Sequence, residues 1–139
     1  MLLGEFNHSI DTKNRVFIPA KFREEFGDTM ILVKGVDRCI SVYSSEEWQK
    51  FSAKLDALPE IDSRRVKRFI YASASEVQPD AQGRVIVTQS MREYAALDKN
   101  VVIIGVGNHA EIWDEALWNN EIEFEDQDSV ASVLKGLGF

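Results

Sequence analysis

The stretch Asp11-Thr-Lys-Asn-Arg15-Val-Phe-Ile18 recurs 69 residues later as Asp80-Ala-Gln-Gly-Arg84-Val-Ile-Val87 in this chain of 139 residues. The correspondence continues where Phe22-Arg23-Glu24 matches Met91-Arg92-Glu93. After a one-residue shift it extends to four more positions: Gly35 with Gly105, Val42 with Ile112, Tyr43 with Trp113, and Trp48 with Trp118. Matches kept in order over so long a span indicate a duplication. Because two copies are too few for a solenoid, we expect a pseudo-symmetric domain whose halves bury each other's apolar faces.

Each copy predicts the same series of elements. A strand at residues 4–10 or 75–78 leads into a tight turn, where Asn and Gly tolerate the positive φ that such turns need. The β-branched and aromatic runs 16–18 and 85–87 predict the returning strands. Short helices follow at 20–26 and 89–97, and two strands close each copy, 30–36 with 40–43 and 101–106 with 110–113. Both copies are therefore expected to be hairpin, helix, hairpin.

Helical spacing of apolar residues predicts further helices outside the two copies. One covers residues 45–57 with Ser44 or Ser45 as its N-cap, and Pro59 ends it. A second runs from about 62 to 74, another begins near Glu115, and a short one occupies 129–137. The chain thus divides into a first repeat with its helix (1–57), a basic linking helix (58–74) and a second repeat with an acidic C-terminal segment (75–139). The expected fold class is α+β and rich in β-structure.

Composition limits the classes of protein to which the chain can belong. The single cysteine, Cys39, excludes an intramolecular disulfide framework, and His8 and His109 are too far apart in sequence for a zinc motif. The glycines lack the spacing of a phosphate-binding loop, so we expect no enzyme, no cofactor and no small-molecule substrate. The chain shows no secretory signal and no apolar run of membrane-spanning length, so we expect a cytoplasmic protein without a membrane partner.

The net charge of −7 argues at first against nucleic acid, because affinity for DNA comes largely from Lys and Arg. However, eight of the 23 acids lie between Glu111 and Asp128, a segment without Lys or Arg. The remainder of the chain carries 15 acids against 16 bases. The acidity is therefore local, and a neutral or basic face remains available for DNA.

These motifs resemble the MraZ family of bacterial regulators, within the wider group of AbrB-like swapped-hairpin proteins. The resemblance covers about residues 4 to 118, and the paired Asp-x-x-x-Arg motifs make it specific. The residues that carry it are Gly4-Glu-Phe-Asn-His8, Asp11 to Arg15, Ile18-Pro-Ala-Lys-Phe-Arg23, Asp80-Ala-Gln-Gly-Arg84, Arg92-Glu-Tyr-Ala95, Ile104-Gly-Val106 and Glu111-Ile-Trp-Asp114. One departure is Thr88, which stands where the first copy and many family members have proline.

The resemblance implies that the two halves interleave into one pseudo-twofold barrel with flanking helices, each half corresponding to one subunit of an AbrB homodimer. It also implies a ring-shaped homo-oligomer that binds double-stranded DNA at short direct repeats in a promoter. The regulated genes are expected to be the cell-division and cell-wall cluster that contains the regulator's own gene, which places the protein at the nucleoid.

Each Asp-x-x-x-Arg motif spans a turn that brings its Asp close to its Arg. In one interpretation the pair only pins the turn, and an exposed ion pair of this kind contributes ~0–1 kcal/mol to stability. In the other, Asp11 and Asp80 orient Arg15 and Arg84 so that their planar donor forks point at phosphate or guanine. The duplication and the resemblance favour DNA contact, and both interpretations can hold together.

Other residues in the two turns also have the chemistry for DNA contact. Lys13 can neutralise a phosphate, and the amides of Asn14 and Gln82 can bind base edges, although all three can equally be ordinary exposed turn residues. Since Lys13, Arg15 and Arg84 are only three cations, one site binds weakly. Useful affinity then needs several sites engaged together, which favours an oligomer on repeated DNA sites.

The richest basic stretch is Arg64-Arg65-Val-Lys67-Arg68 in the linking helix. Three interpretations remain open: a solvated helix face, pairing with the acidic segment of a neighbouring subunit, and direct DNA contact. We favour the first two over DNA contact. The candidate subunit interface joins Arg64, Arg65 and Arg68 to Glu121 and Glu125.

The expected function is sequence-specific DNA binding by a transcription regulator. The alternative is an AbrB-like ring that binds another protein without direct DNA readout. Arginine at both equivalent turns favours the DNA-binding function, because a protein scaffold does not need it.

Overall fold

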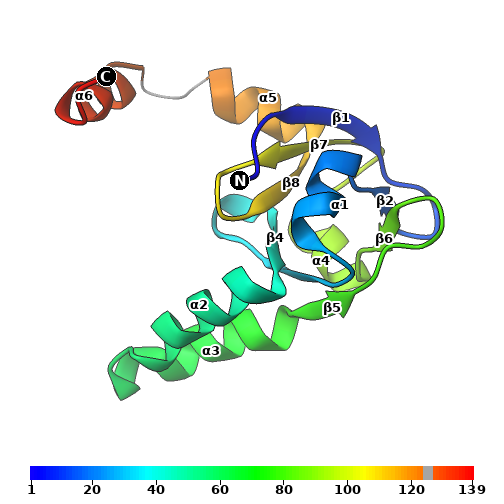
Figure 1. The fold of residues 1–139 in the computed structure, drawn as a ribbon, viewed down its shortest axis with the longest axis horizontal. Coiled ribbons are helices and arrows are strands. Elements are labelled where there is room, and N and C mark those ends of the chain that lie inside the picture. Colours follow the sequence, from blue (N-terminus) through cyan, green and yellow to red (C-terminus); the bar gives the residue numbers. More distant parts are fainter. Residues whose placement is uncertain (124–126) are drawn as a thin grey trace.

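The computed structural model describes residues 1–123 and 127–139, and Figure 1 shows how their helices and strands are arranged. The first half contains β1 (Glu5–Ser9), β2 (Arg15–Phe17), α1 (Ala20–Phe26), β3 (Met30–Lys34), the 3-10 turn η1 (Val36–Arg38), β4 (Ile40–Ser44) and α2 (Ser45–Asp56). Helix α3 (Glu60–Ser73) leads into β5 (Ser75–Val77), β6 (Arg84–Ile86), α4 (Gln89–Tyr94), β7 (Asn100–Gly105), β8 (Ala110–Asp114), α5 (Glu115–Glu123) and α6 (Gln127–Gly136). The protein is of the expected α+β class.

The strands of the two halves pair with each other. The larger sheet has the order β1-β7-β8-β4-β3-β5, and β2 pairs with β6 in a separate two-stranded ribbon. Because the repeat relates β1 to β5, β7 to β3 and β8 to β4, this order reads the same from both ends. The local twofold axis passes between β4 and β8, where Ser41 pairs with Glu111. It also passes through the ribbon, where Val16 pairs with Val85, its own repeat equivalent.

This pairing corrects the expected first hairpin of each copy. The sequence predicts that residues 4–10 pair with 16–18, but β1 pairs with β7 and β2 pairs with β6. Among the described residues only the Ile10–Val16 bridge joins β1's end to β2. A three-residue strand offers β1 few hydrogen bonds, whereas β7 of the other half matches β1 over its whole length. The expected second hairpins, β3 with β4 and β7 with β8, are confirmed.

One hydrophobic core lies between the larger sheet, the ribbon and the two short helices. Val16 and Val85 enter it from the ribbon and are 0% and 1% exposed. Phe22 of α1 and Met91 of α4, which occupy equivalent positions in the repeat, belong to the same buried cluster. Residues of both halves therefore enclose one core, as the duplication predicts.

Four helices, α2, α3, α4 and α6, differ by one to three residues from their expected bounds, and two of these differences have a local cause. Helix α4 ends at Tyr94 instead of residue 97, because Ala96 adopts a left-handed φ of 52°. Helix α3 begins at Glu60, directly after Pro59, instead of near residue 62. Thr88 takes the place of the missing proline as an N-cap, since its Oγ1 accepts a hydrogen bond of 3.1 Å from the Met91 N–H.

Helices α2 and α3 form an antiparallel pair that projects from the body of the molecule (Figure 1). They pack on β4 and β3 through a second apolar cluster built on Val33, Leu55 and Ile70. Figure 1 places this pair away from the turns that follow β1 and precede β6. No helix in the described ranges is long and apolar enough to span a membrane.

Candidate nucleic-acid interface

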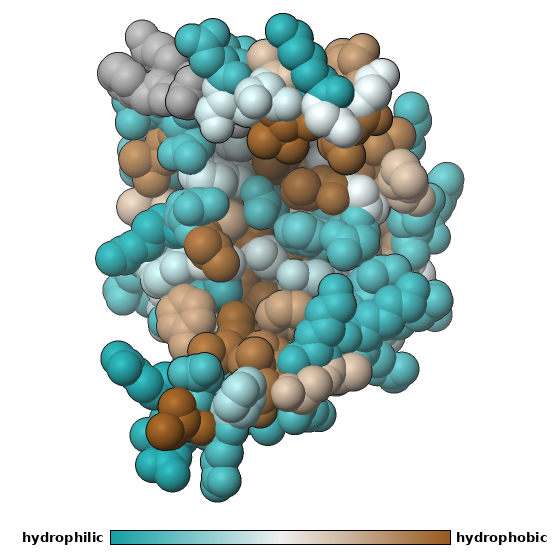
Figure 2. Space-filling view, turned by 90° about the vertical axis from the view of Figure 1, so that its left-hand side faces the viewer, coloured by the Kyte–Doolittle hydropathy of each residue, from teal (hydrophilic) through white to brown (hydrophobic). Residues whose placement is uncertain are grey.

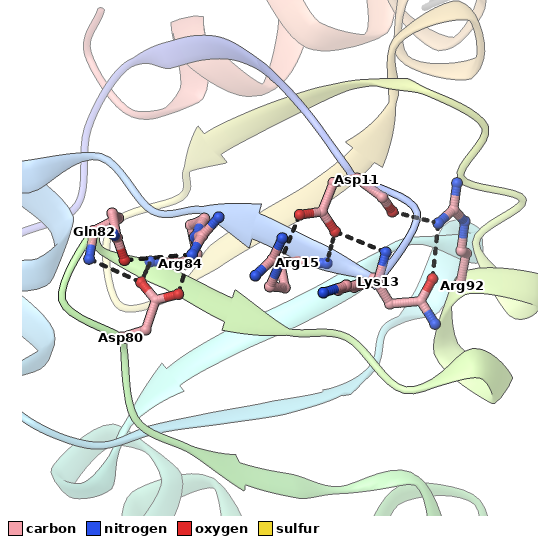
Figure 3. Close-up of polar contacts among 8 residues, drawn as sticks. Asp11, Lys13, Arg15, Asp80, Gln82, Arg84 and Arg92 are labelled. Carbon is pink, nitrogen blue, oxygen red and sulfur yellow. Dashed lines mark hydrogen bonds and ion pairs between the residues drawn. The ribbon is translucent and has the colours of Figure 1, made fainter.

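The β2–β6 ribbon presents an outer face that carries the two motif arginines. Side chains alternate along a strand, so Val16 and Val85 point into the core and their neighbours point outward. The register sets Arg15 opposite Ile86 and Phe17 opposite Arg84. Figure 3 shows one Asp–Arg pair at each end of this ribbon. The pairing of β2 with β6 therefore brings both turns, 69 residues apart, to one surface.

The first turn holds Arg15 through both oxygens of Asp11. Asp11 Oδ1 accepts 2.9 Å hydrogen bonds from the backbone N–H groups of Lys13 and Arg15, and Oδ2 accepts one of 2.6 Å from Arg15 Nε. The Asn14 N–H donates to the Asp11 carbonyl at 3.1 Å and closes the turn. The same carboxylate thus shapes the turn and fixes the arginine, so the two sequence interpretations of the motif are physically compatible.

The second turn repeats this arrangement atom for atom. Asp80 Oδ1 accepts from the N–H groups of Gln82 at 3.0 Å and Arg84 at 2.9 Å, while Oδ2 accepts from Arg84 Nε at 2.9 Å. Gly83 has a φ of 83° at the position equivalent to Asn14, which has a φ of 59°. The residue types that the sequence predicts for a positive φ therefore occupy those positions.

The charged tips of the two arginines face outward. The Arg15 and Arg84 side chains are 29% and 30% exposed. Within residues 1–123 and 127–139, Arg15 uses only Nε of its guanidinium in hydrogen bonds, and Arg84 adds one from Nη2 to Gln82 Oε1 at 3.3 Å. Because each aspartate binds Nε of its arginine, terminal nitrogens of both guanidinium groups remain available to an external acceptor. Such a fork can bind a phosphate or the O6 and N7 atoms of guanine.

The turn hydrogen bonds also lower the pKa of both aspartates. The Arg15 backbone N–H is the main cause for Asp11, and its guanidinium and the Lys13 N–H add to it. For Asp80 the Arg84 backbone N–H is the main cause, with its guanidinium and the Gln82 N–H contributing. Both carboxylates therefore stay ionised well below neutral pH and keep their arginines bound.

Each turn is held in place by the other half of the chain. The Val87 N–H donates to the Asn14 carbonyl at 2.8 Å, and the Ile18 N–H donates to the Gly83 carbonyl at 2.9 Å. These two hydrogen bonds are repeat equivalents of each other. The position of each turn thus depends on the strand that leads into the helix of the opposite half.

Arg92 supports the first turn through its whole guanidinium. Its Nη1 donates to the Asp11 carbonyl at 3.0 Å and to Asn14 Oδ1 at 2.7 Å, its Nε donates to the Leu97 carbonyl at 3.1 Å, and its Nη2 donates to the Asp98 carbonyl. Asn14 Nδ2 donates in turn to Gln89 Oε1 at 3.0 Å. The Asn14 amide is therefore engaged within the protein, in contrast to Lys13 and Gln82, which are exposed.

Arg23, the repeat equivalent of Arg92, contacts the second turn mainly by packing. Its guanidinium carbon lies 5.2 Å from the centre of the Phe17 ring, and its Nε donates to the Ile18 carbonyl at 2.9 Å. A Cβ added to Gly83 would come within 2.6 Å of the same guanidinium carbon. Glycine suits the positive φ here, and a larger residue would displace the Arg23 guanidinium from the turn. The sequence aligned Arg23 with Arg92 but gave no sign that each supports the opposite turn.

The basic and acidic segments named as a subunit interface lie on other elements. Arg64, Arg65 and Arg68 are exposed on α3, and Glu121 is exposed on α5. Glu125 lies outside the described residues. Lys67 of the same basic run pairs with Asp56 of α2 at 3.3 Å. No group of three or more potential metal ligands occurs in the part of the chain that the structure describes.

Comparison with known proteins agrees with the duplication. A family described as "MraZ protein, putative antitoxin-like" matches residues 1–69 and again 70–133. A protein of Acetivibrio thermocellus is 46% identical over 99% of both chains, and one of Clostridium acetobutylicum is 44% identical over the same share. A Carboxydothermus hydrogenoformans protein is 49% identical over 86% of this chain and 85% of its own length. All three are named transcriptional regulator MraZ.

NMR titration of the two aspartates tests the geometry of the turns. In Arg15→Ala the pKa of Asp11 should rise only part of the way to its ordinary value, because the backbone N–H of residue 15 remains. The pKa of Asp80 in the same molecule should not change. A depressed carboxyl pKa adds stability above the unfolded-state pKa, so this stability should be lost as the pH falls below about 4. A complete return of Asp11 to its ordinary pKa would contradict the predominance of the backbone hydrogen bond.

Paired substitutions test the support given by the two helix arginines. Arg92→Ala leaves several acceptors without a donor and should lower the free energy of unfolding by about 1–3 kcal/mol. Arg23→Ala, which removes one hydrogen bond and one ring contact, should cost about 1 kcal/mol. Urea unfolding at one fixed protein concentration measures both. Equal losses would mean that the four hydrogen bonds of Arg92 do not act together.

Proposed function

The chain belongs to the MraZ family, and from this premise we propose that it regulates transcription by sequence-specific DNA binding through the outer face of its β2–β6 ribbon. Its relatives are named transcriptional regulators. The observation that carries the proposal is the pair of equivalent clamps, in which an aspartate binds Nε of an arginine whose tip stays exposed. A guanidinium fixed in this way loses little conformational entropy on binding, which favours specific contact.

The dimensions and chemistry of the ribbon suit the DNA major groove. That groove is about 12 Å wide and admits a two-stranded β-ribbon. Arg15 and Arg84 then reach guanine edges or phosphates through their terminal nitrogens, and exposed Lys13 neutralises a phosphate. Gln82 accepts from Arg84 and keeps its side-chain N–H groups for a base or phosphate. Asn14 acts mainly by holding the turn, since its amide binds Arg92 and Gln89.

We propose that the halves form the interleaved barrel of AbrB-like proteins, a view supported by the strand pairing between them. We also propose that subunits assemble into a ring that engages direct repeats in the promoter of the cell-division and cell-wall genes, at the nucleoid. The small number of cations in one site supports this, because several sites bound together multiply weak affinities. The exposed arginines of α3 and the acids Glu121 and Glu125 are the proposed contacts between neighbouring subunits.

Exposed apolar residues further support self-association. Ile61 on α3 is 87% exposed, and Val133 and Leu137 near the C-terminus are 65% and 78% exposed. Figure 2 shows apolar residues at several places on one face, separated by hydrophilic residues. These exposed side chains are available for contacts between subunits.

Arg15→Ala should abolish the mobility shift of promoter DNA from upstream of the protein's own gene at physiological salt. A bidentate base contact discriminates by about 1–3 kcal/mol, and an oligomer loses that amount at each engaged subunit. The fold should survive, because the lost ion pair is partly exposed and the backbone hydrogen bonds to Asp11 that shape the turn remain.

Arg64→Ala is the matched control, since it also removes one exposed arginine but lies on α3. It should keep operator affinity while altering assembly. Scrambled DNA provides the reference for nonspecific binding. If Arg15→Ala binds the operator like wild type, while Arg64→Ala forms assemblies of normal size but does not bind it, then α3 makes the sequence-specific DNA contacts. If wild type prefers no DNA sequence and instead binds a protein, the ring is an interaction module.

Sedimentation should reveal a species much heavier than the 15.8 kDa chain. If α3 meets the acidic segment of a neighbouring subunit, salt should weaken the assembly, because exposed ion pairs are screened beyond about 8 Å at physiological ionic strength. A monodisperse monomer at micromolar concentration would rule out the ring.

A further inference from the structure

Ile86 is a large apolar side chain on the proposed DNA-binding surface, at the end of the ribbon that carries Arg15. It is 61% exposed, although it lies on a strand whose neighbour Val85 is 1% exposed. The register places it directly opposite Arg15 on the outer face of the ribbon. The expected strand 85–87 thus has one apolar residue that points away from the core. Its exposed side chain is therefore free to contact a partner that binds this face of the ribbon.

The repeat shows that this exposure is specific to the second half. Phe17 is the equivalent of Ile86, and its ring is covered by His8, 4.9 Å away between ring centres, and by the Arg23 guanidinium at 5.2 Å. Arg92, the equivalent of Arg23, donates instead to Asn14 and to three backbone carbonyls. Ile86 therefore lacks the cover that its counterpart has.

We propose that Ile86 is a specificity-determining residue that contacts the C5-methyl group of a thymine in the major groove. This inference rests on the proposed function. The thymine methyl is the apolar group that base edges present in that groove, and an apolar side chain is what recognises it. Directly opposed residues in an antiparallel pair have Cβ atoms about 4.5–5.5 Å apart. Stacked bases are about 3.4 Å apart, so the contacted thymine lies within one or two base pairs of the base read by Arg15.

The contact also gives the ribbon a direction along the duplex. Both ends carry an Asp–Arg clamp, so the clamps alone would read a site equally well in either orientation. Only the end with Arg15 presents an exposed apolar residue beside its arginine. The thymine contact breaks this equivalence and favours repeats that all point the same way.

Deoxyuridine tests the contact because it differs from thymidine only by the missing methyl group. Each thymine of the operator repeats is replaced in turn, and affinity is measured by fluorescence anisotropy. Wild type should lose about fourfold in affinity for each repeat at one thymine position, as expected for one buried methyl group. Ile86→Ala should lose a similar factor on unmodified DNA and should not respond to deoxyuridine at that position. Val36→Ala, which alters an 80% exposed residue outside the ribbon, should behave like wild type in both respects.

Three results would overturn the inference: wild type that ignores every deoxyuridine, Ile86→Ala that keeps the wild-type response, or Ile86→Ala that changes the mass of the assembly. The last would make Ile86 a contact between subunits. Arg15→Ala in the same assay separates this inference from the proposed function. If Arg15→Ala loses binding and deoxyuridine has no effect, the ribbon still reads DNA without the thymine contact. If Arg15→Ala binds as wild type does, both the thymine contact and the proposed function are wrong.

Discussion

The pairing of β2 with β6 is the interaction on which the rest of this structure depends. These two three-residue strands are too short to be stable alone. Their central residues, Val16 and Val85, lie opposite each other in the antiparallel pair and are buried in the shared core. Every strand of one half has a partner in the other, so the chain closes one core from two incomplete halves. The same pairing of β2 with β6 brings the two Asp–Arg turns onto one surface. Stability and the candidate DNA-binding face therefore arise from one set of contacts.

This arrangement makes each turn depend on residues far away in sequence. The Asn14 carbonyl is bound by Val87 N–H and the Gly83 carbonyl by Ile18 N–H, while Arg92 and Arg23 support opposite turns. An arginine fork must be held within a narrow range of orientation to bind two acceptors at once. A turn held only by its own strand would move whenever that strand moves. Anchoring across the halves ties the orientation of both arginines to the shared core.

Local rules predicted the parts of this structure that local interactions determine. The Asp11–Arg15 and Asp80–Arg84 pairs, the positive φ at Asn14 and Gly83, and helix α1 follow from spacing and residue type within a few positions. The partner of β1 did not, because an alternating strand fits any complementary edge and the choice is made by the whole core. The support from Arg92 was also beyond reach, because Arg92 acts across 78 residues to Asn14. The alternation of side chains puts Val85 and Ile86 on opposite faces of β6, but the composition of the run 85–87 does not say which face is buried.

On the proposed DNA-binding surface an acid lies beside each of the two arginines. Asp11 and Asp80 remain ionised, so each cancels most of the long-range attraction of its arginine for phosphate. Nonspecific affinity, which is almost wholly electrostatic, falls with that loss of charge, whereas hydrogen bonding to a base edge depends on orientation and is preserved. In the proposed function, each Asp–Arg pair should therefore weaken binding to arbitrary DNA more than binding to the correct site. A chain with a net charge of −7 can use this difference only if several such sites act together, since each is weak by itself. In the proposed oligomer, the low charge of each chain, the fixed arginines and the repeated DNA sites would together produce specificity from the orientation of the arginines.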